Sequence, residues 1–212
     1  MEADFWHQRW QAGHIAFHER EVNPLLVAHF AQLGLHNGSR VFLPLCGKTH
    51  DIAWLLSQGS RVVGAELSQL AIDALFVDLD LVPDVVQLDG FLHYRAPQLD
   101  IFVGDIFKLT HSILAQVDAV YDRAALVALP LEMRTRYTAH LRAITHTAPQ
   151  LLIALEYDQS VIDGPPFSVD VAEVLAQYAE FYQITVLAES EVVGGLKGKV
   201  DCIERVSLLT KR

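Results

Sequence analysis

A chain of 212 residues, of which 51% are hydrophobic, is long and apolar enough to fold as one substantial α/β domain rather than stay disordered. Its formal net charge of −10 repels a phosphate backbone, so we expect no nucleic-acid partner. The chain has no signal-peptide pattern, no run of 18 apolar residues and only two distant cysteines, so we expect a cytoplasmic protein without a membrane partner or a disulfide.

Short apolar or β-branched runs alternate with helical patterns from about residue 39 onward. The expected strands are 40–45, 61–66, 119–124 and 151–157. The expected helices are 49–59, 68–81 and 131–145, with Ser68 as the N-cap of the second. This alternation predicts βαβ units, and therefore a parallel sheet covered by helices on both faces.

Three segments depart from that alternation. Residues 91–105 hold two short strand candidates around Pro97, which predicts an inserted hairpin. The stretches 184–191 and 202–212 are joined by a loop too short for a crossover helix, so we expect the last strand to run antiparallel in an otherwise parallel sheet. The first 38 residues lack strand character and are expected to form helices over the core.

The stretch 41–56 resembles a phosphate-binding loop at first, since it contains a Gly-Lys-Thr. A P-loop needs a glycine where Phe42 stands, and a dinucleotide fingerprint needs more glycines than Gly47 alone. Glu66 ends the next expected strand 19 residues after Gly47, where an acid can accept both hydroxyls of a ribose. The pair indicates a nucleoside pocket without a pyrophosphate, as S-adenosylmethionine requires. A solvated glutamate at a strand end is the alternative interpretation.

Cys46 and the histidines offer two further chemical interpretations. Cys46 is expected at a helix N-terminus, which lowers the pKa of a thiol, but no histidine is placed to act as its base. A small apolar residue that simply packs at the end of the strand explains Cys46 equally well. His14 and His18 are spaced to share a helix face, yet no HExxH motif or second ligand pair follows, so we expect no metal site.

Aromatic and charged residues mark three more candidate positions. Trp10 and a tryptophan four residues earlier share one face of an expected helix, which indicates either packing on the domain or a lid over a flat, positively charged ligand. Asp122 and Arg123 end a buried strand, where open α/β sheets bind ligands, although an edge ion pair is the alternative. A stiff Pro-Pro turn over 163–169 carries Phe167 toward the same rim, unless it is an ordinary loop.

The order of several short motifs resembles the thiopurine S-methyltransferase family in its shorter bacterial form. The motifs are FWHQRWQAGHIAFHE from Phe5, PLCGK (44–48), VVGAELS (62–68), DRAALVAL (122–129), GPPF (164–167) and DC (201–202). The resemblance runs in order to about Lys211. It implies the class I methyltransferase fold, which is Rossmann-like, with a seven-stranded mixed sheet, an antiparallel last strand and helices on both faces. It also implies one domain over 1–212, in which 1–38 cover the cofactor site.

The resemblance also implies a role for each matched residue. Glu66 takes the ribose hydroxyls of S-adenosylmethionine, and Arg123 meets its methionine end. The implied cofactor-binding residues are Trp10, Leu45, Gly47, Glu66, Asp105, Ile106 and Arg123. The implied acceptor-binding residues are Phe17, Pro165, Phe167 and Lys197. We further expect Arg123, held by Asp122, to orient the acceptor.

The implied reaction is methyl transfer from S-adenosylmethionine to the sulfur of an aromatic or heterocyclic thiol such as a thiopurine. Bacterial relatives are associated with selenium and tellurium compounds too, so metalloid detoxification belongs to the expectation. A methyltransferase-like module that binds the cofactor or a metalloid without thiopurine turnover is the alternative. Mammalian members carry glycine where Ala124 stands and a basic residue in the last loop, for which Lys197 and Lys199 are candidates. We expect a monomer whose partner is a small thiol or selenol.

Overall fold

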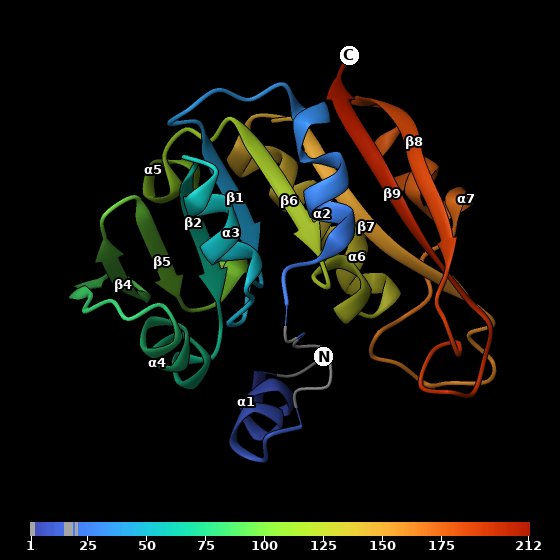
Figure 1. Ribbon diagram of the computed structural model, residues 1–212, viewed down its shortest axis with the longest axis horizontal. Coiled ribbons are helices and arrows are strands. Elements are labelled where there is room, and N and C mark those ends of the chain that lie inside the picture. The colour runs from blue at the N-terminus through green and yellow to red at the C-terminus, as the bar shows by residue number, and fades with distance from the viewer. Residues whose placement is uncertain (1–2, 15–18, 20) are drawn as a thin grey trace. The chain divides into compact units, whose positions relative to one another are not determined.

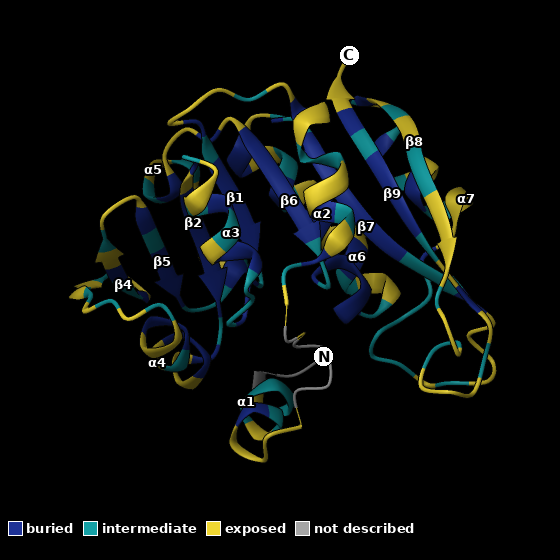
Figure 2. Cartoon of the chain, in the orientation of Figure 1, coloured by how far each residue is buried: buried dark blue, intermediate teal, exposed yellow. Residues whose placement is uncertain are grey.

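Buried strands with helices packed along them form each of two compact units, residues 1–119 and residues 120–212. A computed structural model describes residues 3–14, 19 and 21–212 of the chain (Figure 1). Within each unit the buried residues concentrate in the inner strands, whereas exposed residues lie on helices, in loops and along the outermost strands (Figure 2).

The first unit contains five strands in the order β3-β4-β5-β2-β1. Their bounds are β1 (Arg40–Pro44), β2 (Arg61–Glu66), β3 (Asp84–Leu88), β4 (Phe91–Ala96) and β5 (Leu99–Val103). β1, β2 and β5 are parallel neighbours, while β4 pairs antiparallel with β5 and β3 with β4. The central strand β2 is buried at every residue after Arg61, as its unbroken apolar run requires of a strand covered on both faces.

Short helices connect these strands in the first unit. Their bounds are α1 (Ala3–Gln11), α2 (Pro24–His29), η1 (Phe30–Leu33), α3 (Asp51–Ser57), α4 (Gln69–Asp78), η2 (Ile106–Lys108) and α5 (His111–Leu114). Ser68 caps α4 by accepting a hydrogen bond from the Ala71 amide, and Asn23 caps α2 by accepting from the amides of Leu25 and Leu26. α4 therefore begins directly after the end of β2.

The second unit contains four strands in the order β6-β7-β9-β8. Their bounds are β6 (Ala119–Arg123), β7 (Gln150–Tyr157), β8 (Tyr182–Glu191) and β9 (Cys202–Lys211). β6 and β7 are parallel, and β9 is antiparallel to both β7 and β8. The helices of this unit are η3 (Leu126–Ala128), α6 (Leu131–Thr145) and α7 (Val171–Tyr178).

Most of the elements expected from the sequence are confirmed. β1, β2, β6, β7 and the helices α3, α4 and α6 lie within a few residues of their predicted bounds, and Ser68 is the N-cap of α4. The predicted hairpin is formed by β4 and β5, and the last strand is antiparallel as expected. The prediction of one domain over 1–212 with a cover over 1–38 remains a prediction.

One detail of the predicted sheet is wrong. The described residues contain nine strands rather than seven, and β4 runs against β5, as the predicted hairpin requires. β3 was not expected because it lies at the edge of the first unit's sheet, where its burial is partial and its apolar run is short. No helix among the described residues combines the length and hydrophobicity that crossing a bilayer demands.

Candidate functional site

Glu66 lies at the carboxyl end of β2 and is held by two backbone amides. The Gly47 amide donates to Oε2 and the Ser68 amide to Oε1, both at 2.8 Å. Burial raises the pKa of Glu66, whereas the amides of Ser68 and Gly47 and the nearby His7 act in the opposite direction. A carboxylate has about four lone-pair positions, so these two bonds leave each oxygen able to accept another hydroxyl.

The loop after β1 brings three of the expected cofactor residues to one place. Leu45 has φ 48° and Gly47 has φ 53°, and left-handed backbone of this kind is uncommon outside glycine. A Cβ placed on Gly47 would lie 3.2 Å from Cζ2 of Trp10, which is buried. The indole of α1 therefore packs directly against the loop that binds Glu66.

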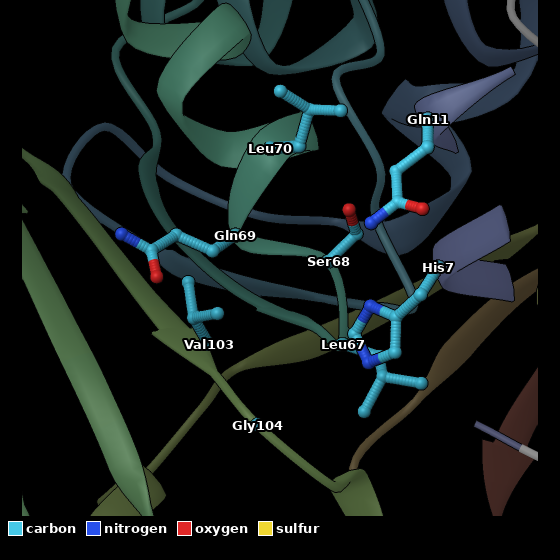
Figure 3. Close-up of a pocket in the computed structure, with 8 residues that line it drawn as sticks. All are labelled: His7, Gln11, Leu67, Ser68, Gln69, Leu70, Val103 and Gly104. Atoms are coloured by element: carbon cyan, nitrogen blue, oxygen red, sulfur yellow. The ribbon is translucent and has the colours of Figure 1, made fainter. Parts of the chain in front are cut away.

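A cavity of about 340 Å³ opens next to Glu66 within the first unit (Figure 3). Its wall is formed by residues of α1, of the β2–α4 connection, of the first turn of α4 and of the carboxyl end of β5. These residues are His7, Gln11, Leu67, Ser68, Gln69, Leu70, Val103 and Gly104. The side chains of His7 and Gln11 point from α1 toward residues 67–68, while Gln69 extends toward Val103 (Figure 3).

None of the cavity residues was predicted from the sequence as a site residue, although several adjoin one that was. His7 and Gln11 flank the turn of α1 that carries Trp10, and their spacing of four residues is the signal that could have identified them. Gly104 donates its amide to the backbone oxygen of Glu66 at 2.8 Å and precedes Asp105. Half of the lining residues are polar, namely His7, Gln11, Ser68 and Gln69.

Asp105 and Ile106 begin the short η2 helix immediately after the cavity. Asp105 is the N-cap, and its Oδ1 accepts a hydrogen bond from the Phe107 amide at 3.0 Å. Ile106 is buried. The structure thus places both residues beside the cavity wall, with the Asp105 carboxylate turned toward the backbone of its own helix.

Asp122 and Arg123 end β6 in the second unit, as expected. Asp122 is fully buried, and burial raises its pKa to about 6 although hydrogen bonds from Tyr137 and Leu126 favour the ionised form. Arg123 is half-buried and is followed by Ala124, whose φ is 59°. The left-handed backbone at Ala124 is the conformation for which glycine is the better residue.

The 164–167 turn and the β8–β9 loop meet in the second unit. Nζ of Lys197 donates to the backbone oxygen of Pro165 at 3.0 Å, and the Tyr157 hydroxyl donates to that of Pro166 at 2.6 Å. The Phe167 amide donates to the Val127 oxygen at 2.6 Å. Two of the expected acceptor residues, Pro165 and Lys197, are therefore in direct contact.

Phe167 has a cationic neighbour that the sequence did not indicate. The guanidinium carbon of Arg134 lies 5.9 Å from the centre of the Phe167 ring, within cation–π range. Arg134 is buried and binds Glu173 through Nε and Nη2, at 2.6 and 2.7 Å. This ion pair fixes the guanidinium beneath the aromatic ring.

Cys46 and Phe17 are two further residues that the sequence singles out. Cys46 does not have the lowered pKa expected at a helix N-terminus, because α3 begins only at Asp51 and burial together with the Glu66 charge raises the pKa of the thiol well above its ordinary value. This finding removes the reason to consider Cys46 a nucleophile. Phe17, an expected acceptor residue, lies outside the described residues.

Comparisons with known proteins give the relatives of this chain. The model of the family described as thiopurine S-methyltransferase matches residues 1–211. The thiopurine S-methyltransferase of Xanthobacter autotrophicus is 53% identical over 212 residues, and the match spans 100% of both chains. That of Teredinibacter turnerae is 47% identical over 211 residues, spanning 100% of this chain and 98% of the relative.

A solved structure gives independent support for the fold. The 1,6-didemethyltoxoflavin-N1-methyltransferase of Burkholderia thailandensis, with bound 1,6-didemethyltoxoflavin and S-adenosylhomocysteine, superposes with a TM-score of 0.65. The match covers 99% of this chain and 87% of that one at 17% identity, so it shows the fold alone and confirms the predicted methyltransferase architecture. From its family match and its full-length relatives, the chain belongs to the thiopurine S-methyltransferase family.

Proposed function

We propose that this chain transfers a methyl group from S-adenosylmethionine to the sulfur of aromatic or heterocyclic thiols such as thiopurines. S-Adenosylmethionine is the methyl donor of the family. The observation that carries the proposal is the buried Glu66 carboxylate, fixed by the amides of Gly47 and Ser68 and followed directly by Leu67 and Ser68 of the cavity wall. Relatives with this name match the whole chain, which supports a thiol as acceptor.

The described residues of the first unit fit a nucleoside. Glu66 retains lone pairs for two ribose hydroxyls. The cavity wall combines apolar side chains with a few polar groups, and its volume of about 340 Å³ lies in the range of small-molecule sites. Asp105 and Ile106 would flank the adenine from the η2 side, and Leu45 would line the pocket from the loop after β1.

Trp10 and its helix suit the role of a cover. The indole packs on Gly47, and His7 and Gln11 from the same helix form one wall of the cavity. When bound, S-adenosylmethionine supplies an electrophilic methyl group on a sulfonium. An aromatic wall near that cation is favourable through cation–π attraction, and a closed wall excludes water from the reacting sulfur.

Residues of the second unit would bind the carboxylate of the donor and the acceptor. Arg123 would bind the carboxylate of the methionine end and help orient the acceptor. Phe167 and Pro165, with Lys197 joined to Pro165, would line the acceptor side together with Phe17. The Arg134–Glu173 pair behind Phe167 would keep the ring in one orientation.

The reaction needs little more from the protein than alignment. A heterocyclic thiol ionises near neutral pH, so its sulfur attacks the methyl carbon as a thiolate without a strong general base. The carbon–sulfur bond to the donor breaks as the new one forms, and the positive charge of the sulfonium is neutralised. Positioning of this kind can supply ~7–11 kcal/mol of barrier reduction. Burial raises the pKa of Cys46, so we expect its thiol to take no part in the transfer.

Selenium and tellurium species are a second class of acceptor that the same chemistry would accept. Selenolates and tellurolates are soft anions like thiolates, so metalloid detoxification is compatible with the proposed site. A binding module without thiopurine turnover is the competing function. A panel of acceptors distinguishes the three, with methyl incorporation from labelled S-adenosylmethionine measured for 6-mercaptopurine, reduced selenite and reduced tellurite. Saturable incorporation into 6-mercaptopurine is expected. Cofactor binding without incorporation into any acceptor would favour the binding module.

A further inference from the structure

The Asp122 side chain is tied down at both of its oxygens. Oδ1 accepts a hydrogen bond from the Leu126 amide at 3.1 Å, and Oδ2 accepts one from the Tyr137 hydroxyl at 2.7 Å. Asp122 and Tyr137 are each 0% exposed, so neither exchange with water nor a change of rotamer is available at low cost. The side chain of Asp122 is thereby fixed from two directions.

The bond from Leu126 closes a turn around Arg123. Residues 122–126 leave the carboxyl end of β6 and enter η3, and the amide of the last residue returns to the side chain of the first. Ala124 within this turn has φ 59°, a left-handed conformation that is unfavourable for an L residue. The turn is therefore strained, and it keeps its shape because Asp122 holds it.

Tyr137 supports Asp122 from the next helix. It lies in the middle of α6, and its hydroxyl is the only part of the ring that can hydrogen-bond. A phenylalanine would fill the same space but would leave Oδ2 of a buried carboxylate without that donor. The choice of tyrosine at this fully buried position is thus explained by Asp122, and not by packing.

We propose that Tyr137 is a positioning residue for Arg123, acting through the Asp122 hydrogen bond that fixes the 122–126 turn. The inference rests on the proposed role of Arg123 in binding the methionine end of S-adenosylmethionine. Tyr137 acts in this role through its hydrogen bond to Asp122 and not by binding the donor or the acceptor. Its hydroxyl sets the path of the backbone on which Arg123 is carried.

A double-mutant cycle separates positioning from ordinary stabilisation. The dissociation constant of S-adenosylhomocysteine is measured by calorimetry for the wild type, Tyr137→Phe, Arg123→Ala and the double variant, together with the melting temperature of each. We expect Tyr137→Phe to weaken binding about tenfold in the wild-type background and less than twofold in the Arg123→Ala background. The fall in melting temperature should be similar in both backgrounds, because the hydroxyl that is removed bonds to the Asp122 side chain.

Tyr182→Phe is the matched control. Tyr182 is also a buried tyrosine of the second unit, and its hydroxyl accepts from Gln150 at 2.8 Å and donates to Ala148 at 3.2 Å. Its substitution removes a buried hydroxyl bond that involves none of residues 122–126. We expect a lower melting temperature with an affinity within twofold of the wild type.

Asp122→Asn provides a second route if Tyr137→Phe does not fold. The amide keeps the shape of the side chain and removes the buried charge, but it cannot accept at both atoms. The same loss of affinity, again absent in the Arg123→Ala background, is expected. An unchanged affinity in Tyr137→Phe and Asp122→Asn, or an equal loss in both backgrounds, would overturn the positioning role.

The outcome for Arg123→Ala separates this inference from the proposed function. If Arg123→Ala binds S-adenosylhomocysteine as tightly as the wild type does, Arg123 has no role that Tyr137 could serve, and the inference is overturned. Methyl transfer to 6-mercaptopurine by the wild type would then still support the proposed function. A wild type that binds no S-adenosylhomocysteine contradicts both.

Discussion

The Gly47 amide donates a 2.8 Å hydrogen bond to Oε2 of Glu66, and this bond joins the loop after β1 to the end of β2. The Ser68 amide, in the short connection between β2 and α4, donates to the other carboxylate oxygen. Two neighbouring parallel strands are thus linked through one buried carboxylate at the edge where α/β sheets bind ligands. The proposed ribose site is part of the framework rather than an exposed side chain.

Replacing Glu66 with glutamine should weaken cofactor binding. The amide retains the size of the side chain, but one of its two terminal atoms can no longer accept a hydrogen bond. Loss of a charged hydrogen bond of about 1.5–3 kcal/mol corresponds to an affinity for S-adenosylhomocysteine that is about 10- to 100-fold lower, as calorimetry would measure. Glu189→Gln removes a half-exposed carboxylate that pairs with Arg205, and it should leave the affinity unchanged. Equal affinities for Glu66→Gln and the wild type would exclude the ribose contact.

Gly47→Ala should disturb Trp10 as well as the backbone. The new Cβ would lie 3.2 Å from Cζ2 of the indole, and φ is 53°, so the substitution strains the loop and displaces the ring. Gly198→Ala is the matched control, because φ is 66° there and no atom lies within 4 Å of the added Cβ. Both variants should lose about 1 kcal/mol of unfolding free energy from the backbone, with an additional loss for Gly47→Ala. Only Gly47→Ala should also bind S-adenosylhomocysteine more weakly.

The stability of the protein should depend on the ionisation of Asp122. Its pKa is raised from 3.8 to about 6 in the folded state, so the native protein binds this proton more tightly than the unfolded chain does. Stability from this group is therefore greatest below about pH 4, falls as the pH rises to about 6, and then stays constant. The full effect is on the order of 3 kcal/mol.

Denaturant unfolding of the wild type and Asp122→Asn between pH 4 and pH 8 measures this effect. Glu66 also has a pKa raised by burial, but it is present in both proteins and cancels in their difference. The wild type should lose stability relative to Asp122→Asn as the pH rises from 4 to 6. A difference that is constant with pH would show that Asp122 ionises normally.

Lys197→Met should affect the acceptor and not the donor. The substitution keeps an apolar stem and removes the hydrogen bond to the Pro165 oxygen, which joins the β8–β9 loop to the 164–167 turn. An exposed hydrogen bond of this kind contributes little free energy. We therefore expect the KM for 6-mercaptopurine to rise about threefold, with the KM for S-adenosylmethionine unchanged. Lys199→Met removes the same charge from the same loop and should leave both constants unchanged. A rise in both KM values for Lys197→Met would contradict an acceptor-side role.

The sequence was most informative where apolar runs are long and capped. The six residues 61–66 are continuously apolar apart from their ends, and β2 has those bounds. Ser68 was identified as an N-cap because a hydroxyl before an apolar helical pattern has one common use. β3 and α7 were not identified, since β3 is a partly exposed edge strand and α7 follows a proline-rich turn that hides its start.

The candidate site was predicted in its polar residues and not in its shape. Gly47 and Glu66 were expected to share a pocket, but their mutual hydrogen bond depends on the path of the loop, which is set by the left-handed Leu45. The cavity wall formed by His7 and Gln11 depends on where α1 packs. The pKa of Cys46 is raised and not lowered, because the thiol is buried beside the Glu66 charge and because α3 begins only at Asp51.

The most direct test of the proposed function is methyl transfer to a thiopurine. Purified wild-type protein and Glu66→Gln would be supplied with S-adenosylmethionine carrying a labelled methyl group and with increasing 6-mercaptopurine, and label in the S-methylated product would be counted. We expect saturable transfer by the wild type, and transfer by the variant that approaches it only at much higher donor concentrations. Donor binding without any label in the thiopurine product would contradict the proposed function.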